Sequence, residues 1–312
     1  MKTTHLIKTS AMLLALAAIS ITGCKKDNNQ DETVDTTPMQ QLAVDQNNME
    51  MSIDEATRDI DGVFASELKS TAFDHKMPCN VTIDSVSVNN DTITVLLVYN
   101  GLNCKGNLNR TGKIELKRKI GQRWGIPNSS LSARFIDYTV TRVSNGKSLT
   151  LNGNKLFRNV TGGFVFLVGT LQDSVTFETT ATLQAVFDNG STRNWNVARC
   201  TTFTGNQDTL QLSITGFGAS GTYSNLVMWG TNRESNEFFT SITTPVVHKE
   251  LCDWDPCSGV KVHVVPAASV STTVTFGYDD NNQPVTGDDC PTRFRTDWVK
   301  NGQSGTVYQP LP

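Results

Sequence analysis

The chain has 312 residues, of which 18% are charged and 38% are hydrophobic, and its formal net charge at pH 7 is -3. The charges are dispersed, and the one local basic cluster, Lys113 to Lys119, alternates with Ile114 and Leu116. This alternation predicts the solvated face of a strand, and with no longer basic block to follow a phosphate backbone we expect no nucleic-acid partner. The length suffices for one large domain or for two packed ones.

The first residues have the layout of an export signal. Lys2 and Lys8 precede an apolar run from Ala11 to Ile21, which is shorter than the roughly twenty residues needed to cross a bilayer. The junction Ile21-Thr22-Gly23-Cys24 resembles the lipobox of bacterial lipoproteins, and this resemblance implies cleavage of residues 1–23 and acylation of Cys24. We therefore expect the membrane to be a partner through the N-terminal lipid. An ordinary secretory peptide is the alternative.

Residues 24–38 are polar and charged and contain almost nothing to bury, so they predict a flexible tether. The start Cys24-Lys25-Lys26-Asp27 resembles lipoproteins of the Bacteroidetes, which implies delivery to the outer membrane and favours exposure on the cell surface. A helical segment is expected over residues 39–70. Its best part is 52–67, where Ser52 and Glu55 match a capping box.

From Asn80 to the end the hydrophobic period changes from 3.6 to 2, which predicts strands. No helical pattern separates the later strands, so the helical crossover connections that parallel strands need are missing. Residues 71–312 are therefore expected to form an antiparallel meander. The predicted fold class is all-β, a curved sheet, sandwich or half-barrel with a short N-terminal helical segment, in one body or two related β units. Five Asn-Gly pairs are candidate hairpin turns, at Asn100, Asn145, Asn152, Asn189 and Asn301. The expected strands are 81–88, 92–99, 113–120, 131–143, 164–171, 174–187, 193–203, 209–215, 222–229, 238–242, 260–265, 274–276 and 293–298.

Besides Cys24 the chain contains six cysteines, an even number that predicts disulfides in an exported protein. Two stretches of similar layout favour the pairs Cys79–Cys104 and Cys257–Cys290, which leave Cys200 with Cys252. A bridge between Cys252 and Cys257 across a turn is the alternative. A zinc site at these two cysteines with His248 is the less favoured interpretation, since structural zinc sites need four ligands at closer spacing.

Residues capable of chemistry are few. The mature chain would keep His75, His248 and His263, and no Gly-x-Ser-x-Gly elbow is present, so we predict neither a catalytic residue, nor a cofactor, nor a metal site. The acidic loop 279–289 lacks the glycine and the terminal glutamate of an EF-hand and is better explained as a solvated hairpin loop. Among the tryptophans only Trp254, between two aspartates in a cysteine-bounded loop, is expected to be displayed. The others, Trp124, Trp195, Trp229 and Trp298, are expected to be mostly core residues.

Several short motifs together resemble a family of Bacteroidetes outer-membrane lipoproteins. This resemblance covers most of residues 75–312, implies an all-β body and carries no activity. We expect a membrane-anchored protein with a binding or structural role, whose partner is a glycan or an envelope protein; an envelope hydrolase is the alternative. The motifs are Val81-Thr82-Ile83-Asp84, Cys104-Lys105-Gly106-Asn107, Arg110-Thr111-Gly112-Lys113-Ile114, Phe135-Ile136-Asp137-Tyr138, Leu151-Asn152-Gly153-Asn154, Cys257-Ser258-Gly259-Val260, Thr275-Phe276-Gly277-Tyr278 and Asp289-Cys290.

Overall fold

The computed structural model describes residues 35, 37–65, 78–206 and 209–311. The expected signal peptide, the lipidation site Cys24, most of the tether and His75 lie outside these residues. Asp35 to Pro312 form one compact unit, to which the following description refers. In the part of the chain that is described, no helix has the length and apolar character that crossing a membrane requires.

One helix, α1 (Thr37–Ala65), precedes the strands. The backbone N–H of Thr37 donates to Asp35 Oδ1 at 3.0 Å, and Pro38 follows in the first turn, as is common at helix starts. The expected start at Ser52 is wrong: Ser52 lies in mid-helix, where its hydroxyl donates to the carbonyl of Asn48 at 2.8 Å. Residues 66–70 of the expected helical segment lie outside the described residues.

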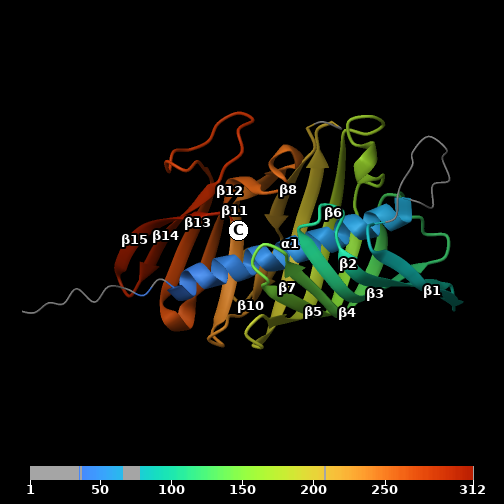
Figure 1. Ribbon diagram of the computed structural model, residues 1–312, viewed down its shortest axis with the longest axis horizontal. Helices are drawn as coiled ribbons and strands as arrows, with labels where there is room; N and C mark the ends of the chain where they lie inside the picture. Colours follow the sequence, from blue (N-terminus) through green and yellow to red (C-terminus); the bar gives the residue numbers. More distant parts are fainter. Residues whose placement is uncertain (1–34, 36, 66–77, 207–208, 312) are drawn as a thin grey trace, which may run out of the picture. The chain divides into compact units, whose positions relative to one another are not determined.

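Fifteen strands of the described chain form a single antiparallel sheet, which confirms the all-β meander (Figure 1). The path runs β1-β2-β3-β4-β5-β6-β7-β10-β11-β12-β13-β14-β15, while β8 pairs with β7 and β11 and β9 pairs with β10. The strands are β1 (Val81–Asn89), β2 (Thr92–Leu102), β3 (Leu108–Lys119), β4 (Ser129–Arg142), β5 (Ser148–Asn159), β6 (Ser174–Phe187), β7 (Thr192–Thr204), β8 (Gln211–Gly216), β9 (Gly218–Ser220), β10 (Tyr223–Thr231), β11 (Glu237–Lys249), β12 (Pro256–Val265), β13 (Val270–Tyr278), β14 (Arg293–Lys300) and β15 (Gln303–Pro310).

The sequence prediction missed β5, β9 and β15 and placed a strand at 164–171, where the chain forms the 3₁₀ turn η1 (Val165–Leu167) instead. Strand β5 was missed because Asn152-Gly153 was interpreted as a turn. Gly153 instead lies inside β5 at φ 130°, and a Cβ there would come within 2.4 Å of the Thr182 carbonyl oxygen. Asn100-Gly101 likewise lies inside β2. Glycine here permits close backbone approach within the sheet rather than chain reversal.

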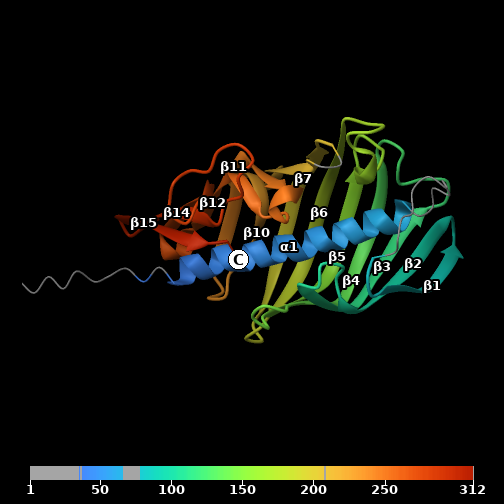
Figure 2. The ribbon, with the colours of Figure 1, turned by 45° about the horizontal axis from the view of Figure 1, so that its top comes forward.

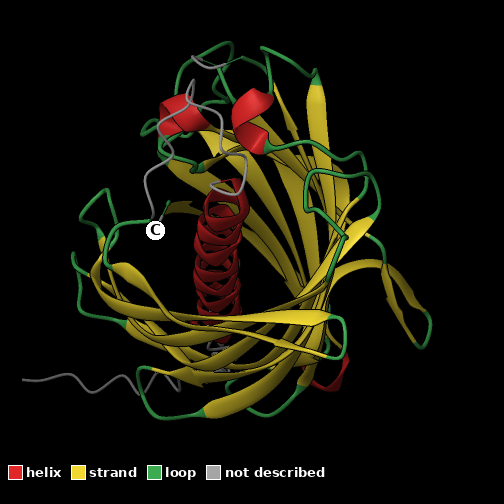
Figure 3. Cartoon of the chain, turned by 90° about the vertical axis from the view of Figure 1, so that its right-hand side faces the viewer, coloured by secondary structure: helices red, strands yellow, loops and turns green. Residues whose placement is uncertain are grey.

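The sheet curves around α1, which lies along its concave face (Figures 2 and 3). Alternate strand residues point inward, so that β6 shows buried residues at every second position for most of its length. The core forms between this inner face and the helix, whose apolar residues recur at spacings of three and four. Buried helix residues include Met39, Leu42, Met49, Ile53, Ala56, Ile60 and Val63, and buried strand residues include Leu97, Ile114, Phe135, Phe157, Leu183, Trp195 and Phe238.

The helix also carries a row of acidic side chains that pair with cations on the inner face of the sheet. Asp45 receives two hydrogen bonds from Arg233 at 2.7 and 2.8 Å. Further along the helix, Glu50 pairs with Lys261 of β12, Asp54 with Arg199 of β7, and Asp59 with Arg110 of β3. These three cations are at most 2% exposed.

One inward cation has no carboxylate partner in the described chain. Lys155 of β5 is 1% exposed, and its ammonium donates to Thr57 Oγ1 at 2.8 Å and lies 3.7 Å from the Phe157 ring centroid. Burial lowers the pKa of Lys155 well below its ordinary value. Polar and ionic contacts thus join α1 to strands from both halves of the sheet.

Two disulfides are present. Cys79–Cys104 forms as expected, but Cys290 pairs with Cys252 and not with Cys257, so the other two expected pairings are wrong. Cys252 belongs to the short turn η2 (Glu250–Cys252), whereas Cys257 is part of strand β12. Cys200 and Cys257 remain free. Strands β8 and β11 separate their strands, a distance of roughly 14 Å across three strand spacings, which is too far for a bridge.

Candidate functional site

A cleft of about 80 Å³ opens between α1 and the two disulfide-braced loops. One wall comes from the loop between β2 and β3, which Cys104 anchors, and the other from residues 253–256, which follow Cys252. Half-buried residues of α1 together with the buried Glu50 form the third side, and Leu212 of β8 and His248 of β11 line the interior. The site therefore combines segments far apart in sequence.

The two loops meet although their strands lie far apart in the sheet order. Lys105 Nζ is 2.9 Å from Asp253 Oδ1, and this pair is largely exposed. The Lys105 ammonium hydrogen bonds to the Asp253 carboxylate and lowers its pKa. Exposed pairs stabilise little, so the importance of this contact is geometric: the curved sheet brings its two halves together above α1.

Trp254 is held at the rim by an unusual backbone. Asp253 and Trp254 both have positive φ, 55° and 66°, which for a bulky residue is a genuine outlier. Such a conformation costs on the order of 1–3 kcal/mol and persists only when surrounding contacts impose it. Here the Trp254 N–H donates to the Lys249 carbonyl at 3.0 Å, its carbonyl oxygen lies 2.8 Å from His248 Nδ1, and the neighbouring Cys252 is bridged.

The Trp254 ring is half-buried and lies between two supports. Its centroid is 6.2 Å from that of Phe203 in an edge-on arrangement, and the Arg58 guanidinium carbon is 5.7 Å from its ring. A tryptophan at a cleft mouth supplies a large rigid apolar surface with little conformational entropy to lose on binding. The strained loop therefore presents an aromatic platform at the cleft.

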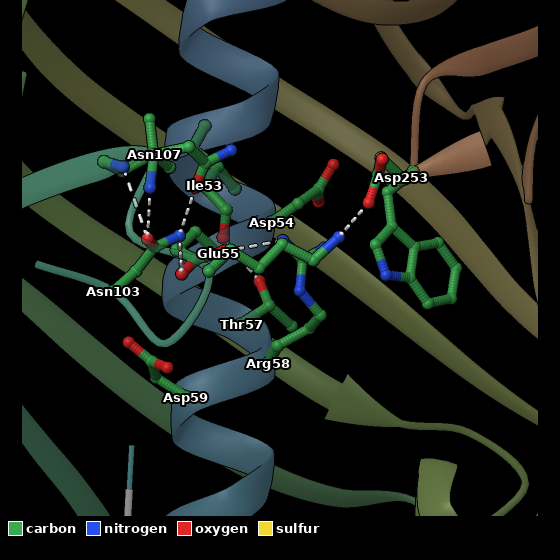
Figure 4. Close-up of polar contacts among 12 residues, drawn as sticks. Ile53, Asp54, Glu55, Thr57, Arg58, Asp59, Asn103, Asn107 and Asp253 are labelled. Carbon is green, nitrogen blue, oxygen red and sulfur yellow. Dashed lines mark hydrogen bonds and ion pairs between the residues drawn. The ribbon is translucent and has the colours of Figure 1, made fainter. Parts of the chain in front are cut away.

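Amide and carboxylate groups from α1 and the β2–β3 loop form a hydrogen-bonded wall beside this platform (Figure 4). Asn103 Nδ2 donates to Glu55 Oε1 at 3.1 Å and to Asn107 Oδ1 at 2.8 Å. Arg58 pairs with Glu55 Oε2 at 2.8 Å. Burial alone would raise the pKa of Glu55, but Arg58, Asn103 and Arg110 outweigh it and hold that pKa below its usual value.

Two acceptor atoms in the cleft interior have no partner in the described structure. They are Glu50 Oε1 and His248 Nε2, both shielded from solvent, and both residues line the cleft. Because His248 Nδ1 faces the Trp254 carbonyl, Nδ1 carries the proton in the tautomer that this contact assigns, and Nε2 exposes a lone pair. Burial lowers the pKa of His248 to about 4, so the imidazole is neutral at pH 7.

The other residues singled out from the sequence lie elsewhere. His263 is buried beneath α1, where its Nδ1 is 2.9 Å from Thr240 Oγ1, which in turn accepts from Gln46. In the acidic loop, Asp279 Oδ1 accepts the backbone N–H groups of Asn281 and Gln283, as expected for a hairpin loop. No group of three metal-ligating side chains occurs among the described residues.

The other tryptophans only partly follow the expectation that they belong to the core. Trp124 and Trp195 are buried, whereas Trp229 and Trp298 are half-buried. The basic cluster behaves as expected, with Lys113, Lys117 and Lys119 exposed. Sequence reasoning singled out Trp254 but missed Glu50, Arg58 and Asn103, whose positions in the cleft depend on long-range packing.

Comparison of the chain with protein-family models, with curated protein sequences and with solved structures gave no match.

Proposed function

We propose that this chain is a lipid-anchored protein of the bacterial outer membrane, exposed on the cell surface, with a binding role that it performs at the cleft above α1. The observation that carries the binding role is Trp254, a large aromatic residue kept in a strained backbone conformation at the mouth of a polar cleft. Strained backbone conformations of this kind cluster at ligand-binding and catalytic sites, where the surrounding contacts maintain them. The lipid anchor rests on the Ile21-Thr22-Gly23-Cys24 junction.

Binding is favoured over catalysis by the state of the ionisable groups. The carboxylates of Glu50, Asp54, Glu55 and Asp253 are paired with cations, so they are poor candidates for a general base. His248, with a pKa of about 4, is a weak base and no acid at neutral pH. The small volume of the cleft favours part of a small ligand over the surface of a protein partner.

An envelope hydrolase is the second candidate, favoured by one observation. Asp255 lines the same cleft as His248, and burial raises its pKa, with a further contribution from Asp253. A carboxyl of raised pKa in the same cleft as an unpartnered imidazole nitrogen is a pattern found in acid–base catalysis.

The anchor is tested by replacing Cys24 with serine in cells. The variant should leave the membrane fraction, and digestion of intact cells with protease should degrade the unaltered protein. A membrane-bound Cys24→Ser variant would contradict the anchor, and complete protection from protease would contradict exposure.

The binding role is tested by a thermal-shift screen of the lipid-free mature protein. The panel contains neutral sugars, amino sugars, uronic acids, sugar phosphates, amino acids and short peptides. At least one compound should stabilise the unaltered protein and Trp298→Ala, a control at another half-buried tryptophan, but not Trp254→Ala. A panel without such a compound would contradict the proposal, and mass-spectrometric detection of cleaved compound would favour the hydrolase.

A further inference from the structure

The chemistry of the cleft interior points to a class of ligand. Glu50 is 5% exposed, its Oε2 accepts from Lys261, and its Oε1 is left without a partner in the described structure. His248 Nε2 is a second unpartnered acceptor lining the same cleft. Buried polar atoms without partners are rare in native proteins and call for an explanation. Two acceptors in one cleft would be satisfied by a molecule that brings hydrogen-bond donors.

The charges around the cleft further limit the class of ligand. Five carboxylates and two cationic side chains line the cleft, and four of the carboxylates as well as both cations are already paired, so an anion would meet two unpartnered acceptors and no free cation. A cation would likewise find few free carboxylates, because Lys261 and Arg199 already pair with Glu50 and Asp54 behind the interior wall. Burial and these two cations keep the pKa of His248 low, which leaves its imidazole neutral at pH 7. The site therefore suits an uncharged group that donates hydrogen bonds.

The residues at the cleft entrance fit the same class of ligand as those in its interior. Trp254 offers an apolar ring face, and at the opposite wall the exposed amide of Asn107 is held in place by the buried Asn103. An apolar face beside hydroxyl-bonding groups matches the surface of a sugar ring, which has C–H faces and a hydroxyl edge.

We propose that the cleft binds an uncharged, hydroxyl-rich ligand, a neutral sugar or glycan end, whose hydroxyl groups donate to Glu50 Oε1 and His248 Nε2 while its ring lies against Trp254. This inference rests on the proposed binding role and assigns His248 and Glu50 as the residues that determine specificity.

The test uses the lipid-free mature protein, titrated with neutral monosaccharides and oligosaccharides and with their uronic-acid, phosphate and amine counterparts. Neutral sugars should bind most tightly. Preferred binding of the charged counterparts in a Trp254-dependent manner would overturn the ligand class while leaving the binding role intact, whereas absence of any Trp254-dependent binding would contradict both.

A matched pair of substitutions separates recognition from folding. In His248→Asn the amide replaces Nδ1 and keeps the contact with the Trp254 carbonyl, but the Nε2 acceptor is lost. In His248→Gln the side chain places an acceptor near the position of Nε2. His248→Asn should weaken binding of the neutral sugar roughly tenfold, as expected for one lost hydrogen bond, and His248→Gln should weaken it less.

Thermal unfolding and near-ultraviolet circular dichroism of both variants would verify that the fold and the tryptophan environment are kept. Unchanged sugar affinity in folded His248→Asn would show that the ligand does not donate to His248 Nε2, and would overturn the assignment.

Discussion

Replacing Arg199 by methionine should lower the free energy of unfolding by about 3–5 kcal/mol, whereas replacing Lys155 by methionine should leave it unchanged or raise it by up to about 2 kcal/mol. Both side chains point inward, both are at most 2% exposed, and both contact α1. The two substitutions introduce the same residue. The difference in outcome should therefore come from the partners that remain.

Arg199 pairs with Asp54 and lies near Glu50, so its removal leaves a largely buried carboxylate uncompensated beneath the cleft. Breaking a buried pair by removing one partner typically costs 3–5 kcal/mol, a large part of a total stability of roughly 5–15 kcal/mol.

Lys155 has no carboxylate partner in the described chain, and methionine removes its desolvation cost, which amounts to several kcal/mol. The losses are a charged hydrogen bond to Thr57, about 1.5–3 kcal/mol, a longer one to the Ile53 carbonyl at 3.5 Å, and the contact with Phe157, about 2 kcal/mol. Thr57 is not orphaned, because its hydroxyl also donates to the Ile53 carbonyl at 2.7 Å. The balance is near zero or stabilising.

The assay is urea unfolding of the lipid-free mature protein at pH 7, followed by tryptophan fluorescence. Equal destabilisation by both substitutions would refute the reasoning, since it would show that packing volume, and not charge pairing, determines the contribution of these residues. The double variant Arg199→Met with Asp54→Leu should recover much of the loss, because an apolar pair of similar volume often replaces a buried ion pair without cost.

Three further experiments probe other parts of the fold. Removing the Cys252–Cys290 bridge by a double change to serine should cost about 4 kcal/mol in the chain-entropy model for a separation of 38 residues, measured by urea unfolding; a loss below about 1 kcal/mol would contradict the constraint. The pKa of His263 is lowered by burial to about 3, below its unfolded value of about 6.5, so the unfolded chain binds more protons between these values and stability should fall by up to about 5 kcal/mol as the pH drops from 6.5 to 3. Unfolding measured across this range should show a weaker decline in His263→Asn, and identical profiles would contradict the assignment. Gly153→Ala should lower the melting temperature more than Gly190→Ala. The new Cβ at position 153 would meet the neighbouring strand and should lower the melting temperature by several degrees, whereas position 190 lies in an open turn, where alanine should lower the free energy of unfolding by only about 1 kcal/mol. Equal effects would argue against the close approach at Gly153.

Strand alternation was the most reliable sequence signal. Segment 174–187 was predicted as a strand with its residue range unchanged, because its inward positions are apolar for most of the length. The best-signalled part of the helix was predicted to begin at Ser52 because Ser52 and Glu55 match a capping pattern, whereas the true start uses Asp35 and Pro38. When a helix packs along a whole sheet, its contacts with the sheet extend it past local capping patterns.

The buried cations show what sequence reasoning overlooked. Arg110, Lys155, Arg199 and Lys261 each occupy an inward strand position, in phase with apolar neighbours such as Phe157 and Val197. Cations in phase with apolar strand residues and an acidic helix in the same chain could have indicated the pairs that Arg110, Arg199 and Lys261 form with α1. The cysteine pairing was harder, because it depends on which turn residue reaches the loop before β14, and this is set by three-dimensional geometry.

The pairing of Glu50 with Lys261 joins residues 211 positions apart. During synthesis α1 emerges before the strands. Strand β12, which carries Lys261, emerges only after most of the polypeptide has been made. Arg110 and Arg199 emerge earlier and can pair with Asp59 and Asp54, but Glu50 has no counter-charge until then. The core is therefore completed only with late-synthesised segments, and its high contact order slows folding. In a chain with this topology, α1 is made first and therefore stays open to proteolysis and to aggregation for the longest time.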